Sequence, residues 1–299
     1  MSRFAPSGVV IESTAVIANS NNFDGRLVGP LRVACFLPVD DQFEETRRHL
    51  EEALWYLGRI QPLPEAQYRS IEDTNWAEAW KQHYRPIQIG RKLIVVPAWL
   101  EAPSGEREVV RIDPGMAFGT GTHPSTQLCL EIIEGLAGFA ETQKVSKTFR
   151  VFRNVDVIDL GCGSGILAIA ALKLGAHRAL GVDIDADAIA AARENAELNG
   201  VADRLELGEG SLADVLAGSY SLRQAPLVLA NILAPVILRM FDEGLSGLVT
   251  PGGLLVVAGI LAEQAEEITA AALRFGLQLL MTRQEGDWIA LAANKYTPS

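Results

Sequence analysis

The sequence predicts an α/β protein built on a doubly wound, mostly parallel seven-stranded sheet, with a smaller α+β domain at its N-terminal end. Three observations lead to this prediction. From about Val155 onward, strand-like apolar runs alternate with helical segments, which is typical of a parallel sheet covered by helices on both faces. One of these strands runs into a turn with glycine at every second position. Two further apolar runs near the C-terminus have the spacing of a hairpin.

Composition excludes several classes of protein. The 299 residues are 48% hydrophobic, which is ample for a buried core of one large or two modest domains. The sequence lacks both an uncharged apolar run of about 18 residues and a charged-then-apolar leader, so we expect no membrane span and no secretory signal. Three scattered cysteines, Cys35, Cys129 and Cys162, fit a reducing environment, so we expect a cytoplasmic protein.

Charge and metal-ligand spacing narrow the set of partners. The formal net charge of -11 and pI near 4.9 argue against a broad surface for nucleic acid or anionic membrane, because phosphate binding depends on clustered Lys and Arg. We therefore expect no direct nucleic-acid binding. The four histidines have no metal-ligand spacing with one another or with the cysteines, so no metal site is predicted.

The first 75 residues predict a small α+β domain. Apolar runs at residues 9–11 and 31–36 are followed by a charged amphipathic helix over residues 41–57. A linker is expected over residues 76–100, where Trp76 and Trp80 lie four positions apart and so share a helix face that we expect to pack on a core. Residues 101–299 are assigned to the catalytic domain.

A loop rich in glycine and hydroxyl side chains precedes the sheet of the second domain. Strands are expected at residues 93–96 and 109–112, and the loop over residues 118–126 leads into a helix over residues 127–136. Its composition predicts an ordered loop that caps this helix. The connector over residues 141–154 contains four basic residues and is interpreted as a solvated loop rather than an RNA contact.

The glycine turn is the main functional signal. A strand at residues 157–160 leads into Gly161, Gly163 and Gly165, where the absence of a Cβ allows positive φ and close approach of a ligand. The following helix, expected over residues 164–174, directs free N–H groups and its positive dipole end at the same place. About 20 residues on, a second strand ends at Asp183, the position expected to bind ribose hydroxyls.

The spacing of these glycines disfavours a dinucleotide. In G-x-G-x-x-G the pyrophosphate lies on the helix N-terminus, whereas here the third glycine comes one residue early. Asp159, just before the turn, would repel a diphosphate and attract a cation. The D-x-G-x-G-x-G pattern resembles motif I of the class I S-adenosylmethionine-dependent methyltransferases, whose cofactor carries an amino group and a sulfonium.

The rest of the chain continues the alternation. Strands are expected at residues 204–207, 227–230 and 254–258, and a helix over residues 186–199 ends at Gly200. A last helix at residues 262–275 precedes the runs 277–281 and 288–292, which residues 283–287 separate. Such an antiparallel hairpin at the edge of a parallel sheet resembles the class I methyltransferase fold.

Four segments together resemble the PrmA-type ribosomal protein methyltransferases, over about residues 8–293. They are residues 113–126, 159–165, 181–185 and 231–234. The resemblance implies S-adenosylmethionine as cofactor and protein eleven of the large ribosomal subunit as the partner, methylated on α-amino and lysine ε-amino groups. It also implies that Thr126, Gly161, Asp183 and Asn231 contact the methyl donor.

The same resemblance implies further donor contacts. Phe118, Gly119, Thr120 and Gly121 would close over the cofactor. Asp159 and Gly163 belong to the glycine turn that holds it, and residues 209–211 would meet the adenine.

Asn231 is the expected catalytic residue. It follows the fourth strand and faces the glycine turn across the switch point where sheets of this type bind ligands. Its position resembles the Asn of the Asn-Pro-Pro-Tyr motif, whose side-chain oxygen accepts a hydrogen bond from the target nitrogen. Ile232 and Leu233 replace the two prolines, which favours an aliphatic amine over adenine. No dedicated base is evident, so water is expected to take the proton.

Two departures and two alternatives accompany this prediction. The chain starts late relative to the family, so we expect either a misassigned start codon or a recognition domain that lacks the first strand and helix. The connector over residues 141–154 is longer than usual. One alternative is a class I methyltransferase that acts on another protein, an RNA base or a small molecule. The other is a non-catalytic module that binds the donor without turnover.

Overall fold

The computed structural model describes residues 9–13, 31–35, 37, 43–60, 66–68, 85–113, 119–139 and 154–296. The chain divides into two compact units, Met1–Glu78 and Ala79–Ser299. In the first unit, β1 (Val9–Ser13) pairs antiparallel with β2 (Leu31–Cys35), and α1 spans Phe43–Ile60. Trp76 and Trp80 lie outside the described residues.

A three-stranded sheet opens the second unit. In it β3 (Ile87–Ile89) pairs antiparallel with β4 (Leu93–Pro97), and β4 pairs parallel with β5 (Glu108–Ile112). The β3–β4 turn is held by Glu134, whose carboxylate accepts the backbone N–H groups of residues 91–93. Strands β3 and β4 lie within the expected linker, so this part of residues 76–100 is folded into the second unit. The boundaries proposed for the domains stay a prediction.

The main sheet has seven strands in the order β11-β12-β10-β9-β6-β7-β8. Its strands are β6 (Asp156–Leu160), β7 (Arg178–Asp183), β8 (Leu205–Glu209), β9 (Ala225–Asn231), β10 (Val249–Leu261), β11 (Leu277–Glu285) and β12 (Trp288–Lys295). The five strands from β10 to β8 in this order run parallel, in four pairs, and β12 pairs antiparallel with both β10 and β11. The predicted doubly wound sheet with an antiparallel hairpin at one edge is confirmed.

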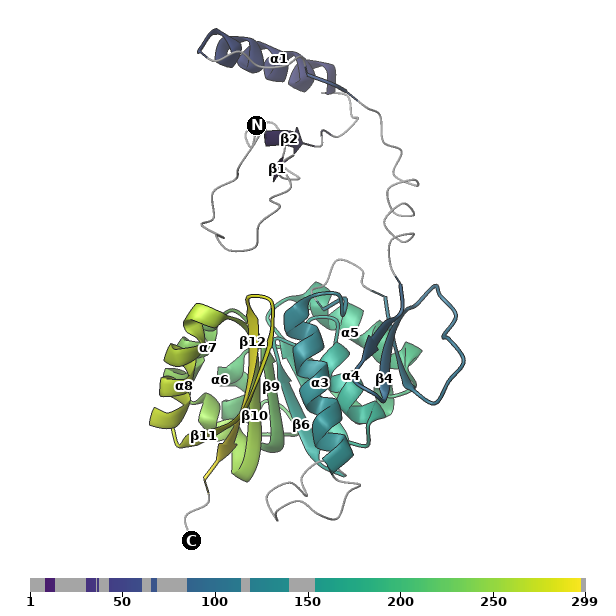
Figure 1. Ribbon diagram of the computed structural model, residues 1–299, viewed down its shortest axis with the longest axis vertical. Coiled ribbons are helices and arrows are strands. Elements are labelled where there is room, and N and C mark those ends of the chain that lie inside the picture. The colour runs from purple at the N-terminus through teal and green to yellow at the C-terminus, as the bar shows by residue number, and fades with distance from the viewer. Residues whose placement is uncertain are drawn as a thin grey trace. The chain divides into compact units, whose positions relative to one another are not determined.

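Helices cover both faces of this sheet, as Figure 1 shows. On one face lie α3 (Pro124–Phe139), α4 (Ile166–Lys173) and α5 (Ala186–Leu198), and on the other lie α6 (Leu212–Ala217), α7 (Ala234–Glu243) and α8 (Ala265–Arg274). The two faces bury separate hydrophobic clusters, and the first also takes in the inner side of the three-stranded sheet. This double coverage explains why the central strands are almost continuously apolar.

Some boundaries differ from the predictions for identifiable reasons. Helix α4 begins at Ile166 rather than 164, because Gly165 has a left-handed φ of 78°. Strand β8 begins at Leu205 because Arg204 ends a 3₁₀ turn. The predicted separation over residues 283–287 is wrong, since β11 continues to Glu285. Its polar residues lie on an exposed edge strand, where ladder pairing needs no apolar side chain.

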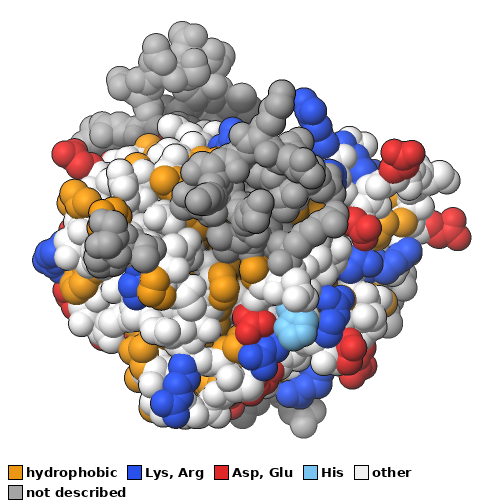
Figure 2. All heavy atoms as spheres, turned by 90° about the horizontal axis from the view of Figure 1, so that it is seen from below, with side chains coloured by type: hydrophobic (Ala, Val, Ile, Leu, Met, Phe, Trp, Pro, Cys, Tyr) orange, Lys and Arg blue, Asp and Glu red, His pale blue; other side chains and the backbone are white. Residues whose placement is uncertain are grey.

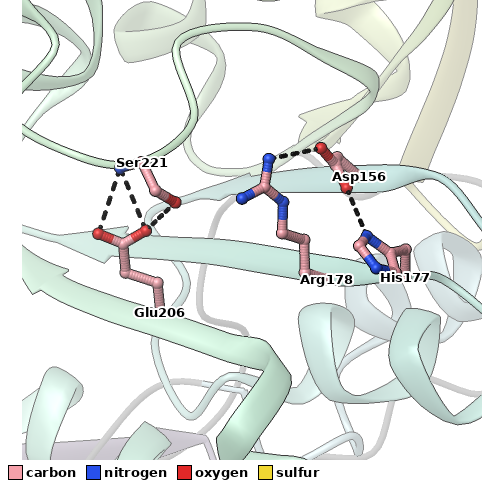
Figure 3. Close-up of polar contacts among 5 residues, drawn as sticks. All are labelled: Asp156, His177, Arg178, Glu206 and Ser221. Carbon is pink, nitrogen blue, oxygen red and sulfur yellow. Dashed lines mark hydrogen bonds and ion pairs between the residues drawn. The ribbon is translucent and has the colours of Figure 1, made fainter.

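Polar contacts lie at the end of the sheet where the parallel strands begin (Figure 3). Asp156 accepts hydrogen bonds from Arg178 at 3.0 Å and His177 at 3.3 Å, and Glu206 pairs with Ser221. Partial burial raises the pKa of Asp156, but the hydrogen bonds and charges of Arg178 and His177 together lower it below its ordinary value. These pairs tie strand ends together.

The surface seen from below mixes charges of both signs with scattered hydrophobic side chains (Figure 2). No one-sign patch dominates the described part of this face. Among the described helices, none is long and apolar enough to cross a membrane. The described residues also contain no group of three or more His, Cys, Asp or Glu side chains arranged to hold a metal ion.

Candidate functional site

The glycine turn after β6 adopts a backbone that only glycine takes easily. Gly161, Gly163 and Gly165 have φ values of 63°, 53° and 78°, all in the left-handed region. The turn is pinned to β7, because the Cys162 N–H donates to the carbonyl of Val182 at 3.0 Å. The glycines therefore form a rigid cradle at the carboxyl end of β6, and α4 begins directly behind it.

Asp183, the last residue of β7, supports this cradle from the side. Its Oδ2 accepts the N–H of Gly163 at 2.9 Å, and its Oδ1 accepts the N–H of Asp185 at 3.1 Å. Its own carbonyl accepts the N–H of Gly210 at 2.8 Å, which draws the segment after β8 to the same place. The carboxylate is only partly buried, so it can also meet a ligand that lies along the turn.

Asp159 lies beneath the turn and is fully buried, with 0% of its surface exposed. Its Oδ2 accepts the N–H of Ala168 in α4 at 3.1 Å, and its Oδ1 has no hydrogen-bond partner among the described residues. Burial raises the pKa of Asp159 to about 7; the hydrogen bond from Ala168 opposes this rise and the negative charge of Asp183 adds to it. A nearby cation would favour the charged form.

Asn231, at the end of β9, is held by Thr126 from α3. Its Nδ2 donates to the Thr126 hydroxyl oxygen at 3.1 Å, and Thr126 is fully buried. Its Oδ1 is buried and has no hydrogen-bond partner among the described residues. A buried acceptor left unsatisfied costs about 1–3 kcal/mol, which makes this oxygen a candidate acceptor for a hydrogen bond from a bound molecule.

Sequence reasoning missed two side chains that connect the cradle to other segments of the chain. Ser164 bonds the loop over residues 119–126, and Asn195 links Ser164 to Asp113. The Ser164 hydroxyl donates to the carbonyl of Gly119 at 2.7 Å, and Asn195 of α5 donates to the carbonyl of Ser164 at 3.0 Å. Asn195 also accepts the N–H of Asp113 at 2.8 Å. One signal for it was available, since a polar Asn lies between Ala192 and Ala196 on the buried face of α5.

His123, just before α3, sets the start of this helix. Its Nδ1 accepts the N–H of Ser125 at 3.2 Å, which satisfies a donor of the first turn. Its ring also packs edge-on against Trp288, with ring centroids 4.5 Å apart. The cap thus sets the start of the helix that carries Thr126, the partner of Asn231.

The structure therefore places most of the predicted site residues around the carboxyl ends of β6, β7 and β9. In this region lie Thr126, Asp159, Gly161, Gly163, Asp183 and Asn231, with Gly119, Thr120 and Gly121 in the fastened loop. Phe118 lies outside the described residues. The Thr120 hydroxyl bonds the Thr122 hydroxyl at 2.7 Å within the loop. The donor contacts assigned to these residues stay predictions.

Comparison with known proteins decides the family. A family model described as Ribosomal protein L11 methyltransferase (PrmA) matches residues 1–296. The chain belongs to this family. It is a methyltransferase, and its methyl donor is S-adenosylmethionine.

Relatives within the family cover most of the chain. A ribosomal protein L11 methyltransferase of Herpetosiphon aurantiacus is 39% identical over 282 residues, which are 89% of this chain and 83% of the relative. One from Pseudomonas putida strain GB-1 is 45% identical over 234 residues, 78% of this chain and 72% of the relative. The crystal structure of a ribosomal protein L11 methylase from Lactobacillus delbrueckii subsp. bulgaricus superposes with a TM-score of 0.59 at 33% identity, covering 72% of this chain and all of that one.

The residues present fit the donor of this family. The cradle offers left-handed glycines for close approach, and its acidic groups, Asp159 and Asp183, suit a molecule with two cationic centres. The unsatisfied Oδ1 of Asn231 adds a hydrogen-bond acceptor in the same region. Residues 157–165 contain no Lys or Arg, which a diphosphate would favour.

A pH experiment tests the role of Asp159. Its raised pKa means that the folded apo-enzyme holds a proton that the unfolded chain releases above the ordinary value of 3.8, so stability falls as pH rises from about 4 to about 7. A bound cation favours the charged form of Asp159 instead, so donor affinity is expected to rise from pH 6 to pH 8. Asp159→Asn should flatten that rise in calorimetric titrations; a variant with the wild-type pH profile would contradict the role.

Removing the Ser164 hydroxyl is expected to loosen the loop. Ser164→Ala leaves the carbonyl of Gly119 without this donor, at a cost of about 1–3 kcal/mol. Part of that cost should appear as weaker donor binding, because the loop and the cradle lose their link. Calorimetry and thermal melts of Ser164→Ala measure both effects, and Ser221→Ala, which removes a bonded but exposed hydroxyl at the opposite edge of the sheet, is the control. Equal donor affinity in the wild type, Ser164→Ala and Ser221→Ala would refute the idea that this hydrogen bond supports donor binding.

Proposed function

We propose that this enzyme methylates primary amines of ribosomal protein L11, namely α-amino and lysine ε-amino groups, and that Asn231 orients the amine. Two curated relatives described above bear the name ribosomal protein L11 methyltransferase, which supports the substrate. The observation that carries the assignment of Asn231 is its buried, unsatisfied Oδ1 at the end of β9. The Asn231 Nδ2 already donates to Thr126, so Oδ1 of Asn231 is left to accept a hydrogen bond from the amine that is methylated.

The chemistry requires a neutral amine in line with the reactive methyl group. When bound, S-adenosylmethionine supplies an electrophilic methyl on a sulfonium. A lysine amine has an ordinary pKa near 10.4 and an α-amino group one near 7.7–8.0, so one proton must leave before attack. Desolvation lowers the pKa of an amine, and water takes the proton. Asn231 then holds an amine N–H so that the lone pair points at the methyl carbon.

Donor contacts are proposed for the residues around the cradle. Gly161 would lie against the methionine part of the donor, and Asp183 would accept the ribose hydroxyls. Thr126 would act through its hydrogen bond to Asn231. Residues 209–211, at the end of β8, would meet the adenine, and the carbonyl of Glu209 accepts the Tyr220 hydroxyl at 2.7 Å.

The remaining proposals concern the rest of the chain. Residues 1–75 would recognise the substrate and residues 101–299 would carry out methyl transfer. The enzyme would work in the cytoplasm, where ribosomal proteins are made. Methylation of an RNA base is disfavoured because Ile232 and Leu233 replace the prolines of the Asn-Pro-Pro-Tyr motif, and Leu233 is 64% exposed.

One incubation separates the candidate substrates. The purified enzyme is mixed with methyl-labelled S-adenosylmethionine and, in separate reactions, with unmodified L11, ribosomal RNA and a metabolite extract. Label in L11 supports the proposal, and mass spectrometry then locates the methylated amines. Label in RNA or in a metabolite would overturn the substrate, and donor binding without label anywhere would overturn the catalytic assignment.

A further inference from the structure

Ile232 occupies the junction between the donor cradle and Asn231. It follows Asn231 directly and precedes α7, and its N–H donates to the carbonyl of Ala258 in β10 at 3.1 Å. Its side chain is half-buried and packs against the core beneath α7 and α8. Two glycines from distant parts of the chain lie against it.

The first of these is Gly161, the opening glycine of the turn. A Cβ placed on Gly161 would lie 2.8 Å from Cδ1 of Ile232 and 2.9 Å from its Cγ1, closer than real Cβ contacts allow. The Ile232 side chain therefore rests directly on the backbone of the cradle. Gly161 thus has a second reason to be glycine besides its φ of 63°.

The second is Gly259, in β10. A Cβ on Gly259 would lie 2.5 Å from the carbonyl oxygen of Ile232, 2.8 Å from its carbonyl carbon and 3.2 Å from its nitrogen. These are backbone atoms, which cannot swing aside as a flexible side chain could. Gly259 has a φ of 81°, and the register between β10 and β12 shifts between Val257 and Ile260. This irregularity turns the strand so that the backbone of Ile232 can lie against it.

We propose that Ile232 is a positioning residue, clamped between Gly161 and Gly259, which fixes the distance from the donor cradle to the Asn231 amide. This inference rests on the proposed function. In-line transfer requires the amine nitrogen and methyl carbon at about 3–3.5 Å, and a misplacement of about 1 Å can cost about 100-fold in rate. A rigid spacer between the donor-binding and acceptor-binding groups supplies that control.

Four variants test the clamp. Ile232→Ala removes both side-chain atoms that lie against Gly161, Ile232→Val removes only Cδ1 and keeps a Cγ atom, and Gly259→Ala pushes on the Ile232 backbone. Gly276→Ala is the control, because Gly276 has a nearly identical φ of 78° but no atom within 4 Å of a placed Cβ. Each protein is assayed for kcat and KM with L11, donor Kd by calorimetry and melting temperature.

The expected pattern distinguishes positioning from stability. Ile232→Ala and Gly259→Ala should lower kcat by about 10- to 100-fold while donor Kd stays close to wild type. Ile232→Val should give a kcat between those of Ile232→Ala and the wild type. Gly276→Ala should keep the wild-type kcat while sharing the loss of melting temperature caused by a strained φ. A kcat that merely follows melting temperature across the four variants would overturn the proposal.

The two proposals can fail separately. A wild-type enzyme that does not methylate L11 would overturn the proposed function and this inference with it. An active wild-type enzyme together with an unchanged kcat in Ile232→Ala would overturn this inference alone.

Discussion

Replacing Asn231 with alanine is expected to remove most methyl transfer, with a loss of about 100-fold or more in kcat, while the donor still binds. The variant deletes Oδ1 of Asn231, a buried acceptor at the end of β9 that has no hydrogen-bond partner among the described residues. Without it the amine can rotate, and its lone pair is no longer held toward the methyl carbon. Single-turnover assays with L11 measure the rate, and calorimetry measures donor affinity.

Two further variants make this test specific. Thr126→Val keeps the shape of residue 126 but removes the acceptor for the Asn231 amide, so it should give a smaller loss of kcat. Asn294→Ala is the matched control, because Asn294 is also half-buried and bonded through Nδ2, but to the carbonyl of Gly252 in β10. Turnover by Asn231→Ala equal to that of Asn294→Ala would remove Asn231 from the catalytic role.

Asp183→Ala is expected to produce the largest loss of donor binding. The carboxylate accepts the N–H of Gly163 and so shapes the cradle, and it is the group proposed to hold the ribose. Hydrogen bonds to a charged group are worth about 1.5–3 kcal/mol, which corresponds to about a 10- to 150-fold rise in donor Kd. Calorimetry with S-adenosylmethionine gives the value directly.

Asp185→Ala separates binding from folding. Asp185 is also acidic and lies two residues away, but its side chain caps α5 by accepting the N–H of Asp187 at 2.9 Å. Its loss should cost about 1 kcal/mol of stability, with donor affinity retained. Weak donor binding in Asp183→Ala that Asp185→Ala reproduces in full would show that the carboxylates act through the fold and not through the ribose.

Much of the fold was predictable because its signals are local. The central strands and helices are long, strongly patterned and bounded by glycines such as Gly200, whose φ of 66° follows the last turn of α5. Edges were harder. Strand β11 was predicted too short because its exposed polar residues lack an apolar pattern, and β3 was missed because three residues carry almost no periodicity.

The candidate site divides in the same way. The positions of Gly161, Gly163 and Asp183 in this region were predictable. The glycine spacing and the carboxylate at the end of the next strand form a pattern within about 20 residues of sequence. The roles of Ser164 and Gly259 were not predictable. Their roles depend on partners far along the chain, such as the carbonyl of Gly119 for Ser164 and the backbone of Ile232 for Gly259.

The amino-acid sequence by itself determined the alternation of strands and helices, the glycine turn and the residue types that can meet a cationic methyl donor. These follow from backbone sterics and hydrophobic periodicity, which act between near neighbours. Only the tertiary structure decided that Thr126 occupies one end of the Asn231 amide and that Ile232 lies between two glycines. Thr126 and Asn231 lie about a hundred residues apart in the sequence, and Ile232 lies dozens of residues from each of its two glycines. Packing brings such segments together only when the whole sheet has formed.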